Sequence, residues 1–274
     1  MEDVMKKFSL HGRTALVTGG AGLLGKQFTL ALGQAGARVV AADLNFDAAK
    51  DHAQQLEAVG IPAVAVRVDI TDPASVSAMV EHAVSEFGSL DILVNSAALD
   101  PKFDPEHVGD QSSNAFETYP LDTWKQAVDV NLTGLFLACQ AAAKQMLTQE
   151  YGVIINICST YGLVGPDQRI YERPGGPEQF KPVYYTVTKA GVLGLTRYLA
   201  TYYAGKPIRV NALTPGGVYN QHDDVFLQAY SARTVVGRMA KPAEMSGAIV
   251  FLASEASSYM TGANLIVDGG WTAW

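Results

Sequence analysis

The stretch YYTVTK, residues 184–189, brings two phenols and one amine close together. On a helix, Tyr185 and Lys189 stand four positions apart and therefore share one face, whereas Tyr184 points about 100° away. A nearby ammonium favours the phenolate and lowers the pKa of a phenol, which is ordinarily about 10. Tyr185 is therefore the better candidate for proton transfer. We expect Tyr184 to be a packing residue or part of a pocket wall.

A glycine-rich turn, VTGGAGLLG at residues 17–25, joins a β-branched run to a helix-like segment. Glycines let the backbone approach a phosphate, and the start of a helix supplies free N–H groups and a favourable dipole. We expect Gly19 and Gly25 to form the turn and the helix–sheet contact. A plain strand–helix turn is the alternative.

Two carboxylates end the next two β-branched runs. Asp43 lies about 20 residues beyond the turn, where a carboxylate accepts the ribose hydroxyls of an adenosine and repels a 2′-phosphate. No Arg follows it directly in ADLNF, so the sequence favours NAD over NADP. Asp69 could meet the adenine amino group. Capping is the alternative for both residues, of a helix by Asp43 and of the next turn by Asp69.

Short apolar runs alternate with longer helix-like segments along the chain. Runs that are apolar at consecutive positions are typical of strands buried on both faces, and this alternation predicts a doubly wound parallel sheet with helices on both faces. The expected strands are 14–20, 37–43, 63–69, 91–97, 153–159, 208–214 and 264–270. The expected helices are 24–35, 46–59, 73–86, 122–149, 185–204 and 242–253.

Two irregular stretches, 99–121 and 163–183, are rich in Pro and Gly, and both follow strands. Loops of this length in a compact domain are usually functional or disordered. Ligands of open α/β sheets bind at the carboxyl ends of the strands, where these loops begin. We therefore expect them to be insertions that form the substrate site of one catalytic domain spanning residues 1–274.

Composition excludes several classes of protein. The 274 residues are 48% hydrophobic and 17% charged, with a net charge of −7 and no cluster of Lys and Arg, which argues against a nucleic-acid surface. The start of the chain lacks the apolar region of a signal peptide, and no apolar run is long enough to span a bilayer. Cys139 and Cys158 form no CxxC pair, so we expect a reducing cytoplasm and no disulfide. The five scattered histidines predict no metal site.

The motifs TGGAGLLG, NSAA, YYTVTK and VDGG, in this order, resemble those of the short-chain dehydrogenase/reductase family from about residue 8 to residue 270. The resemblance implies a single-domain, Rossmann-type, seven-stranded α/β fold, a nicotinamide cofactor and a homotetramer. It also implies a catalytic set of Asn131, Ser159, Tyr185 and Lys189.

The resemblance gives each catalytic residue a role. Tyr185 would exchange a proton with an alcohol or ketone, and Lys189 would hydrogen-bond the nicotinamide ribose. Ser159 would hydrogen-bond the substrate oxygen, and Asn131 would kink its helix and hold a water that relays protons to the lysine. Cys158 replaces the first residue of the family's Ser-Ser-like pair, and we expect it to be buried and inert.

The expected cofactor-binding residues follow from the same resemblance. They are Gly19, Gly22, Leu23, Leu24, Asp43, Leu44, Asp69, Ile70, Asn95, Ala97, Lys189, Pro215, Gly216 and Val218. Leu23 stands where the family pattern TGxxxGxG has its middle glycine, and Gly22 precedes it. We expect Asn95 to support the sheet beside the adenosine, with a simple strand-end turn as the alternative.

Ser159 and Tyr185 are 26 residues apart, about twice the family's usual spacing, so the 163–183 loop should form a wall or lid of the substrate pocket. Arg169, Arg173, Lys181 and His222 could face a carboxylate or phosphate, or only solvent. Trp271 and Trp274 could cover a neighbouring subunit's pocket, lie in an interface, or simply pack.

The polar loops and the resemblance to sugar and polyol dehydrogenases together predict a function. We expect an NAD-dependent oxidoreductase that interconverts a secondary alcohol and a ketone on a sugar, sugar-acid, polyol or activated-sugar substrate. Two alternatives remain open: an acyl-chain 3-oxo ketoreductase that uses NADPH, and a non-catalytic NAD(H)-sensing protein.

Overall fold

The fold is built on one parallel sheet. The structure is a computed structural model that describes residues 3–100, 114–173, 175–176 and 178–274. Within these residues the seven strands run in the order β3-β2-β1-β4-β5-β6-β7. They are β1 (Thr14–Thr18), β2 (Arg38–Asp43), β3 (Ala63–Arg67), β4 (Ile92–Asn95), β5 (Gly152–Ile157), β6 (Ile208–Pro215) and β7 (Asn264–Val267). The doubly wound α/β fold predicted from the sequence is confirmed.

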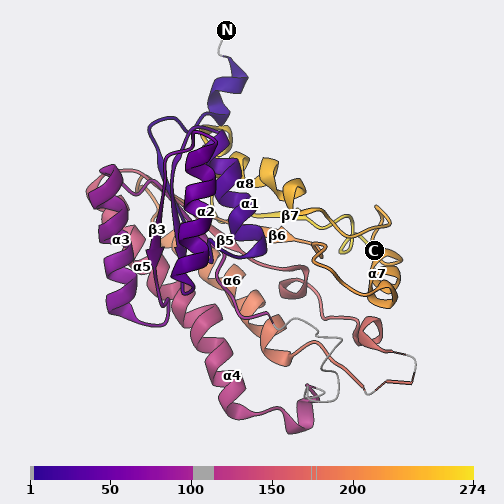
Figure 1. The fold of residues 1–274 in the computed structure, drawn as a ribbon. Helices are drawn as coiled ribbons and strands as arrows, with labels where there is room; N and C mark the ends of the chain where they lie inside the picture. The colour runs from indigo at the N-terminus through magenta and orange to yellow at the C-terminus, as the bar shows by residue number, and fades with distance from the viewer. Residues whose placement is uncertain (1–2, 101–113, 174, 177) are drawn as a thin grey trace.

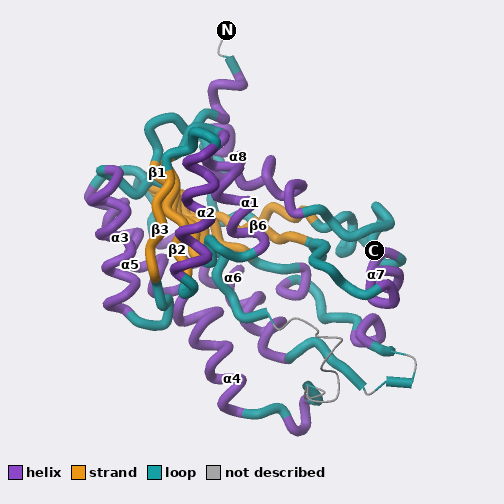
Figure 2. The backbone as a smooth tube through the Cα atoms, viewed as in Figure 1, coloured by secondary structure: helices purple, strands orange, loops and turns teal. Residues whose placement is uncertain are grey.

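Helices cover both faces of the sheet (Figure 1; Figure 2). They are α1 (Leu23–Gln34), α2 (Phe46–Ala58), α3 (Pro73–Phe87), α4 (Leu121–Val128), α5 (Leu135–Thr148), α6 (Val183–Tyr202), α7 (Asp224–Ser231) and α8 (Ser246–Ala253). One apolar cluster joins α3, α5 and α6 to the sheet, and two others pack α1, α2 and α8 against the opposite face. This explains why every residue of β1, β4 and β5 is buried.

Two helical segments differ from those predicted. The expected continuous helix over 122–149 is interrupted by a π-helical segment, Asp129–Gly134, between α4 and α5. Helix α7 was not predicted, and Asp223 begins it by accepting the Phe226 N–H at 3.0 Å. The predicted third helix is present as α3, where Asp72 accepts the Ala74 N–H at 3.0 Å as the cap and Pro73 is the first helical residue.

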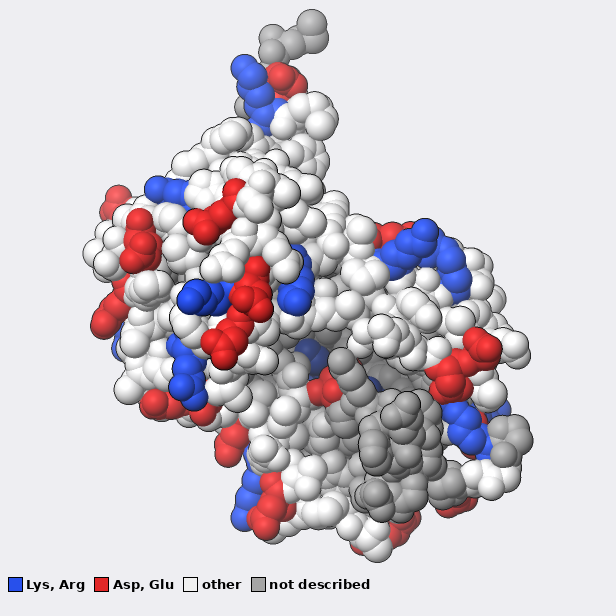
Figure 3. All heavy atoms as spheres, in the orientation of Figure 1, with Lys and Arg blue, Asp and Glu red and all other residues white. Residues whose placement is uncertain are grey.

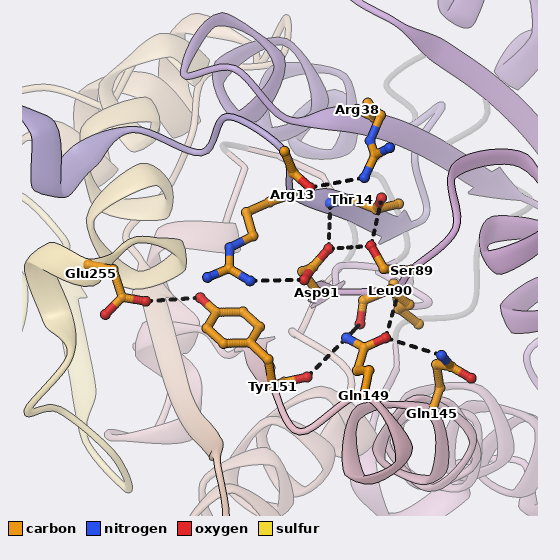
Figure 4. A network of polar contacts seen from close by, with 11 residues as sticks. Arg13, Thr14, Arg38, Ser89, Leu90, Asp91, Gln145, Gln149, Tyr151 and Glu255 are labelled. Atoms are coloured by element: carbon orange, nitrogen blue, oxygen red, sulfur yellow. Dashed lines mark hydrogen bonds and ion pairs between the residues drawn. The ribbon is translucent and has the colours of Figure 1, made fainter.

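A buried carboxylate ties the amino ends of the central strands together (Figure 4). Asp91 directly precedes β4, and its Oδ2 accepts the Thr14 N–H at 2.8 Å and the Ser89 hydroxyl at 2.6 Å. Its Oδ1 accepts from the Arg13 guanidinium at 3.1 Å, and that guanidinium lies 3.5 Å from the centre of the Tyr151 ring. This cluster fixes β1 against β4 at the amino ends of both strands. Ligands of open α/β sheets bind at the opposite, carboxyl ends.

Charged side chains are dispersed over the face drawn in Figure 3, where acidic and basic groups alternate without a continuous basic patch. Within the described residues, none of the helices has the length and apolar character needed to cross a membrane. The same part of the chain contains no cluster of three His, Cys, Asp or Glu side chains suited to a metal ion.

Replacing Asp91 should destabilise the fold without touching the carboxyl edge of the sheet. Asp91→Ala leaves the buried Thr14 N–H and the Arg13 guanidinium without their acceptor, and we expect a loss of about 3 kcal/mol. Urea unfolding at one fixed protein concentration measures this loss. Asp122→Ala, at a carboxylate that is almost fully exposed, is the control and should change the free energy of unfolding by less than about 0.5 kcal/mol. Equal effects of the two variants would contradict this role for Asp91.

Candidate active site

All the predicted cofactor-binding residues gather at the carboxyl edge of the sheet or lie on the elements that begin there. Parallel strands bring their carboxyl ends to one edge, and β1 lies between β2 and β4, so the chain order reverses there. The β1–α1 turn carries Gly19, Gly22, Leu23 and Leu24, and the ends of β2 and β3 carry Asp43, Leu44, Asp69 and Ile70. The ends of β4 and β6 carry Asn95, Ala97, Pro215, Gly216 and Val218.

The glycine-rich turn has no room for a side chain at Gly19, Gly20 or Gly25. Gly19 has φ +65°, and a Cβ there would lie 2.9 Å from the Ala97 backbone. A Cβ on Gly25 would lie 1.9 Å from the Gly19 carbonyl oxygen. Gly22 begins α1 without a side-chain cap, which leaves the N–H groups of the first turn for a ligand. This cradle fits the pyrophosphate of a dinucleotide.

Asp43 is anchored beside that cradle. Its Oδ2 accepts the Ala21 N–H at 3.0 Å, and its Oδ1 accepts the Asn45 N–H at 3.0 Å. The cap of α2 is Asn45, which accepts the Ala48 N–H at 3.2 Å, so the capping alternative for Asp43 is wrong. The carboxylate thus has a fixed position at the end of β2, half-buried, next to the exposed Leu44.

The end of β3 supports both interpretations of Asp69. Its Oδ1 accepts the Thr71 N–H at 2.9 Å and the Thr71 hydroxyl at 2.7 Å, and these hydrogen bonds lower the pKa of the carboxyl. The turn is therefore capped by Asp69, yet the side chain stays exposed to a ligand. Ile70 lies against the π-helical segment, since a Cβ on Gly134 would approach its Cδ1 to 2.7 Å.

The Asn95 side chain links two neighbouring strands of the sheet. Its Nδ2 donates to the Asn156 Oδ1 at 2.9 Å, which links β4 to β5. Its Oδ1 is buried and has no hydrogen-bond partner among the described residues. The N–H groups of Ser96 and Ala97 donate to the Thr18 hydroxyl, at 3.2 and 3.3 Å. Asn95 therefore does more than end a strand, because its side chain joins β4 to β5.

Helix α6 presents Tyr185 and Lys189 together. The Lys189 ammonium lies 5.7 Å from the centre of the Tyr185 ring and donates to the Ile157 carbonyl at 2.9 Å. Tyr184 is 4% exposed and its ring lies 6.2 Å from that of Tyr119. The two tyrosines thus separate as their helical positions predict, with Tyr184 in packing and Tyr185 beside the amine.

The protein alone does not lower the pKa of Tyr185. Burial raises this pKa well above the usual value, the Asp100 carboxylate adds to the rise, and a hydrogen bond with Ser159 opposes it. Burial also lowers the pKa of Lys189. The phenol is therefore protonated at neutral pH, and the lowering expected from the amine requires a further positive charge in the site.

Cys158 and Ser159 directly follow β5 and have different surroundings. Ser159 accepts the Tyr161 N–H at 3.3 Å and contributes to the hydrogen bonding of Tyr185. Cys158 is 3% exposed, within the apolar cluster below, and its thiol donates to the Lys189 carbonyl at 3.2 Å. The predicted buried position of Cys158 is confirmed.

Asn131 occupies the π-helical segment and ties three elements together. Its Oδ1 accepts the Leu99 N–H at 2.7 Å, and its Nδ2 donates to the Leu99 carbonyl at 3.1 Å. The same Nδ2 approaches the Thr188 hydroxyl at 3.2 Å, one residue before Lys189. Asn131 thereby positions the start of the 99–121 loop against α6. The backbone irregularity expected at this residue is present as the π-helical turn.

An aromatic wall rises beside Tyr185. It consists of Tyr161, Tyr171, Phe226, Tyr230 and Trp271, which form one apolar cluster with Tyr185 at its margin. Trp271 stacks on Tyr230 at 4.3 Å between ring centres and is 7% exposed, so it packs within its own chain. Trp274 is 78% exposed, with its indole N–H on the Arg233 carbonyl at 3.2 Å. Sequence reasoning missed Tyr161 and Tyr171, although both follow β5 closely.

Of the four charged candidates, three are paired with carboxylates, and one of these, Lys181, also lies beside the Tyr185 ring. Arg169 pairs with Asp167 at 2.8 Å and is largely exposed, and Arg173 pairs with Asp223 at 2.7 Å. The Lys181 ammonium lies 4.1 Å from the centre of the Tyr185 ring. His222 stacks on Phe226 with 5.0 Å between ring centres.

Asp100 pairs with Lys181 and was missed by sequence reasoning. It lies near the start of the long loop that follows β4, and no local motif marks it. Of the two predicted insertions, residues 101–113, 174 and 177 lie outside the described part of the chain.

Comparisons with known proteins agree with this geometry. A family model described as "Enoyl-(Acyl carrier protein) reductase" matches residues 20–272. D-threitol dehydrogenase of Mycolicibacterium smegmatis is 35% identical over 97% of this chain and 95% of its own length. A 3-alpha-(or 20-beta)-hydroxysteroid dehydrogenase of Mycobacterium bovis is 38% identical over 96% of this chain and 91% of its own.

The crystal structure of a gluconate 5-dehydrogenase from Burkholderia cenocepacia J2315, in complex with NADP and tartrate, superposes with a TM-score of 0.86. It is 30% identical and covers 99% of this chain and 100% of its own. The chain belongs to the short-chain dehydrogenase/reductase family. It is accordingly an oxidoreductase of alcohols and ketones that uses a nicotinamide cofactor.

Gly25 offers a test of the cradle. In Gly25→Ala the new methyl group collides with the Gly19 carbonyl, so the turn must open, and we expect NADH affinity to fall at least ~10-fold because the N–H groups lose their alignment. Titration of NADH fluorescence measures the affinity. Gly247→Ala is the matched control, since a Cβ there meets nothing within 4 Å in helix α8. Unchanged NADH binding in Gly25→Ala would contradict the assignment of this turn.

Proposed function

We propose that the protein is an NAD-dependent dehydrogenase that interconverts a secondary alcohol and a ketone on a sugar, sugar-acid, polyol or activated-sugar substrate. The observation that carries this proposal is the Tyr185 phenol held between Ser159 and the Lys189 ammonium at the carboxyl edge of the sheet. The D-threitol and gluconate dehydrogenases among the similar proteins support the substrate class. A panel of polyols, sugars, aldonic acids and nucleotide sugars, assayed with NAD⁺ and NADP⁺, tests it.

Tyr185 is the proposed general acid and base. Bound oxidised nicotinamide would accept hydride from the alcohol carbon, and its positive ring favours the phenolate. In ketone reduction, the protonated phenol donates its proton to the substrate oxygen, which the Ser159 hydroxyl holds by a hydrogen bond. In alcohol oxidation, the phenolate accepts that proton. Positioned proton transfer of this kind contributes about 10²- to 10⁴-fold to rate.

Lys189 and Asn131 support that proton transfer. The Ile157 carbonyl fixes the Lys189 ammonium, which stabilises the phenolate and can reach a ribose hydroxyl of the cofactor. Asn131 holds the Leu99 backbone and the Thr188 hydroxyl beside it. We propose that a water between Asn131 and Lys189 carries the proton away from the site.

The choice of NAD over NADP rests on Asp43. A carboxylate fixed by two backbone N–H groups accepts ribose hydroxyls and repels a 2′-phosphate. Arg67 is the neighbour of Asp43 in the register of β2 and β3, and it is the exposed cation that could favour NADP. The gluconate dehydrogenase with bound NADP makes this choice worth testing directly.

The polar loops favour hydroxyl-rich substrates over the two apolar classes suggested by the comparisons. Acyl chains and steroids need continuous apolar walls, whereas the described loops place the Asp100–Lys181 ion pair beside the Tyr185 ring. An acyl-chain ketoreductase using NADPH is the second candidate function, because the matching family model is described as an enoyl-(acyl carrier protein) reductase. A cytoplasmic homotetramer of single-domain subunits completes the proposal, on the basis of family membership.

Tyr185→Phe distinguishes an enzyme from an NAD(H) sensor. Removing the phenol oxygen should lower kcat about 10²- to 10⁴-fold while NADH binding is retained. In the wild type, kcat for oxidation should rise with pH as the phenol, whose pKa burial raises, loses its proton, and this rise should vanish in the variant. Tyr184→Phe is the control and should keep both kcat and its pH dependence. A Tyr185→Phe enzyme of normal kcat would rule out the proposed acid–base role.

Asp43→Asn tests the cofactor preference. The amide keeps the shape and one acceptor but removes the charge, so kcat/KM for NAD⁺ should fall and that for NADP⁺ should rise, which narrows their ratio by about 10- to 100-fold. Arg67→Gln is the companion variant and should leave the NAD⁺ value unchanged. A wild-type preference for NADP⁺ that Arg67→Gln abolishes would overturn the role given to Asp43.

A further inference from the structure

One ion pair joins the two long loops directly beside the reacting phenol. Asp100 opens the loop after β4, and Lys181 closes the loop after β5. Their side chains form an ion pair, and the same Lys181 ammonium lies over the Tyr185 ring, 4.1 Å from its centre. The ion pair and the Tyr185 ring therefore lie close together.

The pair is only partly closed to a ligand. The Lys181 side chain is 12% exposed, but that of Asp100 is 48% exposed. Its Oδ1 receives the ammonium, while no hydrogen bond from a described residue reaches its Oδ2. An ammonium has three donors, and one is directed to Asp100. An acceptor and a donor thus remain available side by side.

The Asp100 carboxylate also acts electrostatically on several tyrosines and on His222. It raises the pKa values of Tyr161, Tyr171 and Tyr185, after burial as the main cause. It also opposes the lowering of the His222 pKa, of which burial is again the main cause. The Asp100 charge therefore acts on side chains of α6 and of the segments that follow β5 and β6.

The third polar group at this place is neutral at neutral pH. The Asn220 N–H donates to His222 Nδ1 at 3.2 Å, so the proton of the neutral ring lies on Nε2. Burial lowers the pKa of this imidazole, and the Asp223 carboxylate opposes the shift. With Lys181 already paired, these three groups carry no net charge. A substrate carboxylate beside Asp100 would be repelled, whereas a hydroxyl can both donate to Asp100 and accept from Lys181.

We propose that Asp100 and Lys181 form a donor–acceptor pair that binds a hydroxyl group on the carbon next to the one oxidised by Tyr185. This inference rests on the proposed dehydrogenase function and narrows its substrate class to uncharged vicinal diols and polyols. Sites built to hydrogen-bond a substrate hydroxyl reject the analogue that lacks it, because their polar groups are then desolvated without a partner.

Three ring alcohols that differ only in the neighbouring substituent test the proposal. They are cyclohexanol, the vicinal trans-cyclohexanediol, and the hydroxycyclohexanecarboxylate with its carboxylate on the adjacent carbon. For the wild type, kcat/KM should be highest for the diol, by about 10- to 100-fold over cyclohexanol. The hydroxy acid should rank below the diol because its carboxylate meets Asp100.

Asp100→Asn and Lys181→Gln should each reduce the diol-to-cyclohexanol ratio to within about 3-fold of unity, since each removes one charged hydrogen-bonding partner. Asp100→Asn should also raise kcat/KM for the hydroxy acid relative to the diol. Arg169→Gln, which removes an exposed cation of the same loop, is the control and should leave every ratio unchanged. These ratios do not depend on the fraction of folded enzyme, so reduced stability of a variant cannot imitate the result.

If the ion pair only held the two loops together, Asp100→Asn and Lys181→Gln would lower kcat/KM for all three alcohols to the same extent. The ratios between the alcohols would then stay as in the wild type. That outcome would overturn the proposal, as would a wild-type preference for the hydroxy acid. An enzyme that oxidises alcohols of the broader panel but not the vicinal diol would overturn this inference and leave the proposed function intact. An enzyme that oxidises no alcohol of either panel would contradict both this inference and the proposed function.

Discussion

A buried ammonium is the constraint on which the site depends. Lys189 is 6% exposed, and the Ile157 carbonyl at the end of β5 is the acceptor that holds it. A charge this deep is costly unless it is paired and hydrogen-bonded, so helix α6 must keep a fixed position against β5. The register of Tyr185 against Ser159 follows from that position. The geometry of the proposed proton transfer is therefore set by the need to satisfy a buried ammonium.

The same constraint explains the irregular helix opposite α6. Asn131 cannot satisfy its side chain within a regular helix, and it binds the Leu99 backbone instead. The π-helical turn directs this amide toward the Leu99 backbone and the Thr188 hydroxyl. A local departure from helical geometry is often found at functional sites, because it aims a side chain that a regular turn would bury elsewhere.

Periodicity and turn chemistry are sufficient to predict the sheet and most helices, since burial on both faces makes the strands continuous apolar runs. Helix α7 was not predicted because its sequence signal is short. Its capping residue Asp223 also pairs with Arg173, which lies 50 residues away in the chain. The nucleotide side of the site, from Gly19 to Asp43, depends on local motifs and is therefore legible in the sequence. Asp100 and the aromatic wall arise from contacts between distant loops, which no local pattern encodes.

This division has a physical origin. The cofactor side of the edge must present backbone N–H groups at fixed positions, and only a few residue types permit that. At Gly25, for example, a Cβ would lie 1.9 Å from the Gly19 carbonyl oxygen. The substrate side is formed by long loops whose side chains meet only after the sheet has formed. There, Lys181 reaches both Asp100 and the Tyr185 ring. In the proposed enzyme, recognition of the substrate depends on charge pairing across the loops, and proton transfer depends on the helix and strand beneath them, with the Asp100 charge acting on Tyr185 as the link between the two.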